Sequence, residues 1–262
     1  MPVAEIDDLR LHYRQDGPED APVVVLSSSL GEALEMWNPQ IPALSERFRV
    51  LRYDTRGHGR SSVPLGPYTI ERLGRDVLGL LDALDIERAN FCGLSLGGMT
   101  GIWLGSHAAD RLERLVLCNT AAKLGSPEDW EARICQLAEG GMNAVIGTTM
   151  ERWFTPGFRE RERAECTAIQ AMLNVTDPVG YAACCAAIRD MDQRTDLVRI
   201  GVPTLVIAGR HDPVTPPDAM RALAEGIPQA ELVTLDAAHL SNVEAAEAFT
   251  RSLIGFLDKG AL

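Results

Sequence analysis

The sequence of 262 residues predicts an α/β protein in which a mostly parallel, doubly wound sheet carries an inserted helical cap. Three observations lead to this fold class. Strand-like runs alternate with helical patterns up to residue 118, no convincing strand follows for some 70 residues, and strand patterns return after residue 203. We therefore expect a sheet core formed by residues 1–121 and 195–262, and a helical cap formed by residues 122–194.

The first predicted elements follow one another at short intervals. Residues 3–16 alternate between apolar and polar side chains, which predicts an opening β-hairpin. The continuous apolar run 22–26 predicts a strand that is covered on both faces. A helix is expected near 37–44, and the strand 49–53 then leads into the glycine-rich loop 54–62.

The middle of the chain continues this alternation. Thr69 is expected to cap a helix whose apolar face consists of Ile70, Leu73, Val77, Leu80, Leu81 and Leu84. Residues 89–94 and 114–118 predict strands on either side of a helix over 96–108. That helix has glycine at positions 97, 101 and 105, each costing about 1 kcal/mol relative to alanine. We therefore expect its glycine face to pack closely on the sheet.

The segment after residue 122 is predicted to be helical. Helix-like patterns, separated by glycine and proline, lie near 127–139, 142–153, 159–173 and 178–190. Strand patterns return at 203–209 and at 231–235. A final amphipathic helix carries Val243, Ala246, Phe249, Leu253, Phe256 and Leu257.

Composition and charge limit the possible partners. Apolar residues make up 46% and charged residues 24%, as in ordinary globular proteins. The net charge is −12 and no run of basic residues occurs, which argues against nucleic acid or an anionic membrane surface as a partner. The same field repels an anionic substrate, so such a substrate requires a local cationic anchor. The sequence does not fix the oligomeric state.

Targeting signals and metal-binding patterns are not found in the sequence. The start of the chain lacks the basic and apolar segments of a signal peptide, and no stretch approaches the roughly 20 apolar residues of a membrane-spanning helix. We therefore expect a cytoplasmic protein. The six cysteines form neither a Cys-x-x-Cys pair nor zinc spacing with histidine. Free thiols, buried at Cys92 and Cys118, and no metal site are expected.

One short motif predicts a nucleophile. The segment Gly93-Leu94-Ser95-Leu96-Gly97 contains Gly-x-Ser-x-Gly between a predicted strand and a predicted helix. In that position it predicts a nucleophile elbow, a sharp turn that raises Ser95 above the end of the sheet. Glycine suits positions 93 and 97 because the chain turns through strained φ/ψ angles and a neighbouring backbone comes close.

The nucleophile needs a base, because a serine hydroxyl is poorly nucleophilic at neutral pH. Of the five histidines, His239 follows the last predicted strand, and ligands of open α/β sheets gather at such strand ends. His211 also follows a strand but directly precedes Asp212, which would leave no acid for His239. The other histidines are expected at a surface position (His12), bracing the glycine-rich loop (His58) and near a helix C-terminus (His107).

The acid is predicted to be Asp212. It stands in the loop Gly209-Arg210-His211-Asp212-Pro213, directly after the strand 203–209. Asp236 is a fallback acid. Taken alone, Asp212 could be a turn residue before proline and His239 a surface histidine. The position of Ser95, Asp212 and His239 at three strand ends favours a triad.

These features resemble the α/β-hydrolase fold family over essentially the full length of the chain. The resemblance rests on the elbow, the loop 54–61, the acid loop 209–212 and Ala238-His239, and on the order serine, aspartate, histidine along the chain. It implies that Ser95 is the nucleophile and that His239 and Asp212 complete a catalytic triad.

The resemblance also implies an oxyanion hole of two backbone N–H groups. One donor is then Leu96, directly after the nucleophile, and by position the other is Leu30. Where the family often has His-Gly-x, this chain has Ser28-Ser29-Leu30, which is a departure from the family pattern.

Within the family, Ser27-Ser28-Ser29-Leu30-Gly31 followed by Met36-Trp37 resembles the 3-oxoadipate enol-lactonases of the β-ketoadipate pathway of aromatic catabolism. This resemblance implies hydrolysis of a small anionic lactone with no metal or organic cofactor. Arg133 is the first candidate for binding the substrate carboxylate, and Trp153 for an apolar wall. Equally, Arg133 could lie on a solvated helix face and Trp153 in the core of the cap.

Other functions stay open. Carboxylesterases, carbon–carbon bond hydrolases and cofactor-free haloperoxidase-like enzymes of this fold share the triad. A dehalogenase is disfavoured, because its nucleophile is aspartate and this elbow carries Ser95. A non-catalytic ligand receptor on the same scaffold is a further alternative, against which the complete set of triad residues argues.

Overall fold

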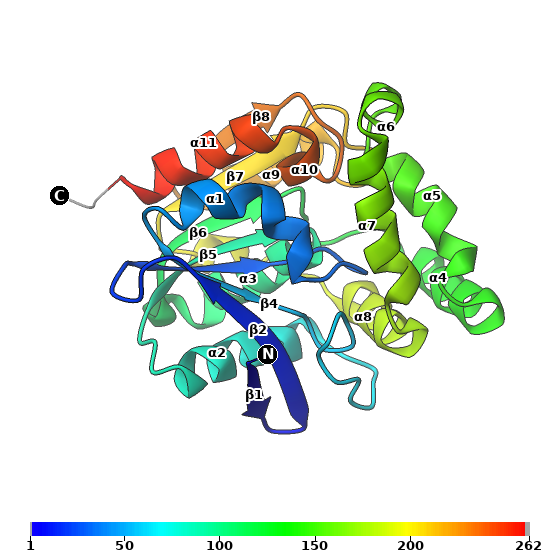
Figure 1. The fold of residues 1–262 in the computed structure, drawn as a ribbon, viewed down its shortest axis with the longest axis horizontal. Helices are drawn as coiled ribbons and strands as arrows, with labels where there is room; N and C mark the ends of the chain where they lie inside the picture. The colour runs from blue at the N-terminus through cyan, green and yellow to red at the C-terminus, as the bar shows by residue number, and fades with distance from the viewer. Residues whose placement is uncertain (1, 260–262) are drawn as a thin grey trace.

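The computed structural model describes residues 2–259, which form one eight-stranded sheet (Figure 1). The strands are β1 (Val3–Ile6), β2 (Leu9–Asp16), β3 (Val23–Ser27), β4 (Arg49–Tyr53), β5 (Ala89–Leu94), β6 (Leu112–Cys118), β7 (Thr204–Gly209) and β8 (Glu231–Leu235). Their order across the sheet is β1-β2-β4-β3-β5-β6-β7-β8. The pairs β1–β2 and β2–β4 are antiparallel and the other pairs are parallel, so the predicted mostly parallel sheet is confirmed.

Helices cover both faces of the sheet. One face carries η1 (Leu34–Gln40), α1 (Ile41–Leu44) and α11 (Ala246–Leu257), and the other carries α2 (Ile70–Ala83), α3 (Leu96–His107) and α9 (Pro217–Gly226). Adjacent residues of β3 pack against different helical layers, since successive side chains of a strand point to opposite faces. Leu26 packs in the cluster that contains Trp37 and Phe249, whereas Val25 packs in the cluster that contains Val77.

Five helices lie between β6 and β7 and are called the helical insertion below. They are α4 (Pro127–Gly140), α5 (Asn143–Trp153), α6 (Pro156–Arg161), α7 (Arg163–Val175) and α8 (Pro178–Asp190). Figure 1 shows them grouped in green at one end of the sheet. Proline begins α4, α6 and α8, where its missing N–H has no helical partner to lose. Residues 1 and 260–262, which belong to the predicted core, lie outside the described residues.

Several predicted helix boundaries were wrong. The single helix expected over 159–173 is two helices, because Glu162 has φ −110° and ψ 53° and ends α6. The helix expected near 37–44 begins earlier and is divided between the 3₁₀ helix η1, which contains Pro39, and the short helix α1. The final helix is interrupted at Ala245, which separates α10 (Ser241–Glu244) from α11. Helix α9 was not predicted. The short 3₁₀ turns η2 (Ala109–Arg111) and η3 (Leu197–Arg199) complete the elements.

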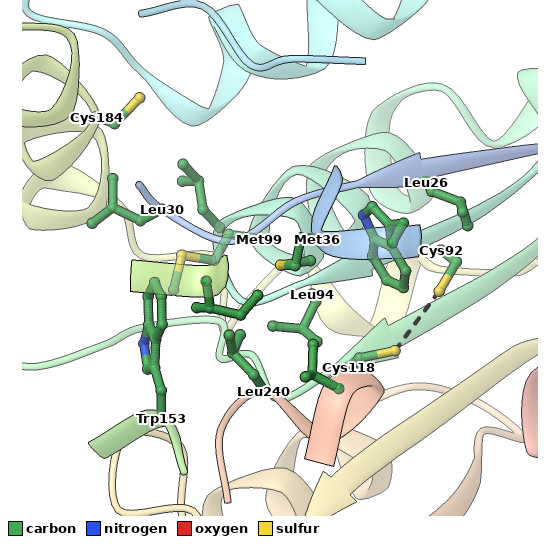
Figure 2. Close-up of a cluster of buried hydrophobic side chains, with 14 of the residues drawn as sticks. Leu26, Leu30, Met36, Cys92, Leu94, Met99, Cys118, Trp153, Cys184 and Leu240 are labelled. Carbon is green, nitrogen blue, oxygen red and sulfur yellow. Dashed lines mark hydrogen bonds between the residues drawn. The ribbon is translucent and has the colours of Figure 1, made fainter. Parts of the chain in front are cut away.

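The core on the α11 face continues without a break into the helical insertion. Figure 2 shows Leu26, Cys92 and Leu94 from the strands in one cluster with Leu30, Leu240 and Trp153. The Sγ atoms of Cys92 and Cys118 lie 3.8 Å apart on neighbouring strands. All six cysteines are free thiols and these two are buried, as predicted.

Membrane-spanning potential was assessed for residues 2–259. No single helix there is long and apolar enough to cross a membrane. Only α7 and α8 together reach the necessary length and composition, as a pair bent by 95°.

Candidate active site

Ser95 stands at a sharp turn between β5 and α3. Its φ of 56° and ψ of −112° lie outside the conformations that L-residues ordinarily adopt. The Ser95 N–H donates to the carbonyl of Cys118 at 2.9 Å, and the Thr120 hydroxyl donates to the carbonyl of Ser95 at 2.7 Å. Contacts with the end of β6 therefore hold the strained residue in place.

The glycines around Ser95 are required by close backbone approach. A Cβ at position 93 would lie 2.1 Å from the carbonyl oxygen of Gly97, and one at position 97 would lie 2.2 Å from that of Ser27. Further along α3, a Cβ at Gly101 would lie 3.0 Å from Phe91. The predicted close packing of the glycine face on the sheet is confirmed.

The structure brings Ser95, His239 and Asp212 into one hydrogen-bonded chain. His239 Nε2 lies 3.0 Å from Ser95 Oγ, and His239 Nδ1 lies 2.8 Å from Asp212 Oδ2. Asp212 lies in the loop after β7 and His239 in the loop after β8. All three side chains are buried, so the contacts between them are shielded from solvent. This geometry lets His239 take a proton from Ser95 while Asp212 fixes the imidazole tautomer.

The carboxylate of Asp212 accepts several hydrogen bonds. Its Oδ1 accepts from the backbone N–H groups of Val214 at 2.7 Å and Thr215 at 3.1 Å. Its Oδ2 accepts from the Thr215 hydroxyl at 2.6 Å and from Asn119 Nδ2 at 2.9 Å, besides His239. Burial alone raises the pKa of Asp212, but the charge of His239 and these hydrogen bonds outweigh burial and lower the pKa below its ordinary value. Asp212 is therefore ionised at neutral pH.

Two backbone donors accompany the serine. Leu96 is the first residue of α3, so its N–H has no partner within the helix. Leu30 lies in the loop after β3 and lines the same pocket as Ser95. Within residues 2–259, neither the Leu30 nor the Leu96 N–H donates to a backbone or side-chain acceptor. Both remain available to an oxyanion, and this role stays a prediction.

A cavity of about 70 Å³ opens above Ser95 between the core and the helical insertion. The core contributes Ser29, Leu30, Ser95, Val214 and His239. The segment between β6 and α4 contributes Leu124, and the insertion helices contribute Trp130, Arg133, Thr149, Arg152, Trp153, Tyr181 and Ile188. The sequence-predicted Arg133 and Trp153 therefore line the same pocket as the triad. Arg152 and Tyr181 were missed, since no sequence pattern distinguishes them from other residues of the insertion.

Arg133 carries a charge without an acidic partner. Its Nη2 donates to the Thr149 hydroxyl at 2.8 Å and to the Tyr181 hydroxyl at 2.5 Å. Its guanidinium also lies 5.4 Å from the centre of the Tyr181 ring. Burial, only partly offset by Arg133, raises the pKa of Tyr181 to about 12, so this hydroxyl is neutral. No carboxylate among the described residues pairs with Arg133 or with the exposed Arg152. Both guanidinium groups are therefore available to bind an anionic ligand.

Comparison with known proteins agrees with the fold. The family model described as alpha/beta hydrolase fold matches residues 22–144 and 154–246. The chain belongs to the α/β-hydrolase fold family.

Three relatives of this α/β hydrolase are informative. It is 44% identical to 3-oxoadipate enol-lactonase 2 of Acinetobacter baylyi, over 94% of this chain and 92% of that protein. The crystal structure of the enol-lactonase from Burkholderia xenovorans LB400 is 52% identical, has a TM-score of 0.96 and covers 98% of this chain and 99% of that one. A thermophilic esterase from Thermogutta terrifontis is 30% identical, has a TM-score of 0.91 and covers 96% of this chain and 94% of that one.

His12, His58 and His107 of this α/β hydrolase do not line the pocket above Ser95. His12 was predicted at the surface, which is wrong: it is 2% exposed, and its Nδ1 lies 2.7 Å from Asp54 Oδ2. The glycine-rich loop folds back over β2 and buries it. His58 braces that loop as predicted, with Nδ1 3.1 Å from the carbonyl of Arg56. His107 ends α3 as predicted.

The alternative base and acid are paired with each other. His211 Nε2 lies 2.9 Å from Asp236 Oδ1, and both side chains are exposed. His211 therefore has its own carboxylate partner, and the fallback acid Asp236 contacts His211 instead of His239. Within residues 2–259, no group of three or more His, Cys, Asp or Glu side chains is placed to hold a metal ion.

Proposed function

We propose that this protein hydrolyses 3-oxoadipate enol-lactone to 3-oxoadipate, with Ser95 as nucleophile, His239 as general base and Asp212 as the orienting acid. The observation that carries the proposal is the hydrogen-bonded chain of these three residues at the base of a pocket that also holds the unpaired cation of Arg133. The similarity to enol-lactonases of two bacteria supports the substrate class.

Acylation follows from the geometry of the triad. Ser95 Oγ attacks the lactone carbonyl while His239 Nε2, at 3.0 Å, accepts its proton. Asp212 holds the Nδ1–H and stabilises the imidazolium that forms. The carbonyl oxygen becomes an oxyanion that accepts from the N–H groups of Leu30 and Leu96, each worth about 3 kcal/mol in comparable enzymes.

Ring opening and deacylation complete the reaction. Cleavage of the acyl C–O bond releases an enolate, which takes the proton from His239 and becomes a ketone. This tautomerisation makes ring opening effectively irreversible. Water, deprotonated by His239, then attacks the acyl carbon on Ser95, and the proton returns to Ser95 Oγ. One water is consumed and the serine is regenerated.

The helical insertion serves in this proposal as a cap over the substrate. Arg133 binds the substrate carboxylate and Trp153 forms an apolar wall, and Arg152 adds a second positive charge at the mouth of the pocket. These local cations oppose the overall charge of −12, which otherwise repels an anionic substrate.

The proposal is tested by replacing the nucleophile. Ser95→Ala is expected to lower kcat for the enol-lactone by about 10⁶-fold, as loss of a catalytic serine does in subtilisin. Ser106→Ala is the matched control, because Ser106 lies on the same helix and its hydroxyl contacts, among the described residues, only Ile102, Trp103 and His107 of α3 itself. Enol-lactone turnover that survives in pure Ser95→Ala protein would exclude the mechanism.

Carboxylesterase activity is the second candidate, favoured by the similarity to the esterase from Thermogutta terrifontis. We expect kcat/KM for the enol-lactone to exceed that for a neutral p-nitrophenyl ester and for a neutral vinylogous diketone, since of these three only the lactone carries a carboxylate for Arg133. A higher kcat/KM for the neutral ester would favour the esterase, and for the diketone a carbon–carbon bond hydrolase.

A further inference from the structure

Asn119 follows β6 in an unusual backbone conformation. Its φ of 43° lies in the left-handed region, which residues other than glycine rarely adopt and which asparagine tolerates better than most. The residue is completely buried, at 0% exposure. Its N–H donates to the carbonyl of Ile207 on β7 at 2.9 Å, so the strained backbone is fixed to the sheet. Backbone strain at a buried position next to an active site indicates a specific role for the side chain.

Both N–H groups and the oxygen of the Asn119 side-chain amide are hydrogen-bonded. Its Nδ2 donates to Asp212 Oδ2 at 2.9 Å and to the carbonyl of Ala238 at 3.2 Å. Its Oδ1 accepts from the Ser241 hydroxyl at 2.5 Å. A carboxylate and a carbonyl can only accept, so the amide nitrogen must face them, and no other orientation satisfies all three partners.

These contacts join the acid loop to the base loop. Ala238 directly precedes His239 and Ser241 begins α10 two residues after it, so Asn119 holds the segment that carries the base on both sides. Asp212 Oδ2 is also the oxygen that contacts His239 Nδ1. At Gly209, an added Cβ would lie 2.9 Å from the Asn119 amide nitrogen, so the end of β7 packs directly against the Asn119 side chain.

We propose that Asn119 is a positioning residue for the triad. Asn119 fixes the distance between Asp212 and His239. The hydrogen bond from its side-chain Nδ2 favours the ionised carboxylate of Asp212. Asn119 is not among the pocket-lining residues, so it acts through Asp212 and His239 and not on the substrate. The inference rests on the proposed Ser95–His239–Asp212 mechanism and adds to it a residue from a fourth segment of the chain.

Asn119→Ala tests this role. We expect kcat/KM for the enol-lactone to fall by about ten- to a hundred-fold, because a hydrogen bond to a charged group is lost. KM should change by less than about twofold, since no substrate contact is removed. The acid limb of the kcat/KM profile, which reports protonation of the base, should move to higher pH, because an Asp212 carboxylate with one donor fewer attracts a proton on His239 more strongly. Asn90→Ala is the matched control: it removes a buried asparagine bond to Val23 on the same sheet.

Asn119→Asp provides a second variant of nearly the same shape. It places a carboxylate against Asp212 and Ala238, and should reduce kcat/KM at least as far as alanine does, again with an altered acid limb. Unchanged pH profiles in both variants would overturn the assignment. Failure of both to fold, under conditions in which Asn90→Ala folds, would also overturn it, because Asn119 would then serve the fold alone.

A serine-directed phosphonate separates this inference from the proposed function. Its rate of labelling Ser95 depends on the triad but not on the lactone. Slower, pH-shifted labelling of Asn119→Ala than of wild type supports the positioning role even if another ester proves to be the substrate. Wild-type protein that is neither labelled nor active would overturn the mechanism and the inference with it. Normal labelling of Asn119→Ala would overturn the inference alone.

Discussion

Two buried carboxyl groups in this protein have pKa values that are shifted in opposite directions, because their partners differ. Asp212 accepts hydrogen bonds from two backbone amides and from three side chains, and it is ionised. Glu32 is 0% exposed, and neither of its oxygens has a partner among the described residues. Burial raises the pKa of Glu32 well above its usual value, which favours the protonated carboxyl group in the folded protein.

Glu32 therefore predicts a pH-dependent loss of stability. The folded-state pKa lies above the unfolded value of about 4.5, so the folded state binds the proton more tightly, and stability decreases as the pH rises above that value. Glu32→Gln removes this dependence. We expect its Tm to match wild type near pH 4 and to exceed it by about 2 °C or more at pH 8. The exposed Glu19→Gln is the control. A Tm difference that does not vary with pH would contradict the prediction.

Residue-level prediction from the sequence worked where position along the chain constrains a side chain. Ser95, Asp212 and His239 were chosen because each follows a predicted strand, and parallel strands bring such ends together. Their proximity is now a structural finding, while their chemical roles stay predictions. His12 was misplaced because strand alternation does not reveal that a loop 40 residues later folds over it. Arg152 was missed because the sequence does not indicate which insertion residues face the pocket.

At the scale of elements, most predicted ends lie within a residue or two of the observed ones, and the wrong boundaries lie where two helices follow one another directly. The strands β4, β5 and β8 begin and end where short apolar runs indicated, since a run between loop residues has few alternative limits. In the insertion, α4, α5 and α8 lie within one residue of their predicted ends, whereas α6 and α7 were predicted as one helix, because amphipathic helices that meet in consecutive turns give one continuous pattern. The break at Glu162 depends on a single backbone conformation that composition does not determine.

Two glycines within helices allow the effect of packing to be distinguished from the effect of intrinsic helix propensity. Gly147 lies within α5 with open space around an added Cβ, whereas a Cβ at Gly97 in α3 would lie 2.2 Å from a backbone oxygen. Gly147→Ala should therefore stabilise the protein by about 0.5–1 kcal/mol. Gly97→Ala should destabilise it by about 3 kcal/mol or more, because backbone atoms must move. Urea unfolding measures both, and similar effects at the two positions would contradict this account of α3.

At the scale of the whole molecule, the helical insertion is fixed to the core by specific backbone contacts. The Thr176 hydroxyl donates to the carbonyl of Gly31 at 2.7 Å, next to the proposed oxyanion donor Leu30. Gly180, in the first turn of α8, lies against Gly57 of the glycine-rich loop, where a Cβ on Gly180 would lie 2.3 Å from the Gly57 oxygen. The glycine-rich loop, to which the sequence assigned no contact with the insertion, therefore packs directly against the start of α8.

The contact between Gly180 and Gly57 predicts that a substitution far from the reacting atoms changes substrate binding. In Gly180→Ala the start of α8 must move by roughly 1 Å, and Tyr181, which holds Arg133, must move with it. We expect KM for the anionic lactone to rise by about tenfold, while the rate of phosphonate labelling at Ser95 stays within about twofold of wild type. Gly201→Ala, with open space around the added Cβ, is the control for an added methyl group. An unchanged KM in a folded Gly180→Ala protein would mean that the seating of α8 does not determine where Arg133 meets the substrate, and the carboxylate anchor would then have to be sought at Arg152.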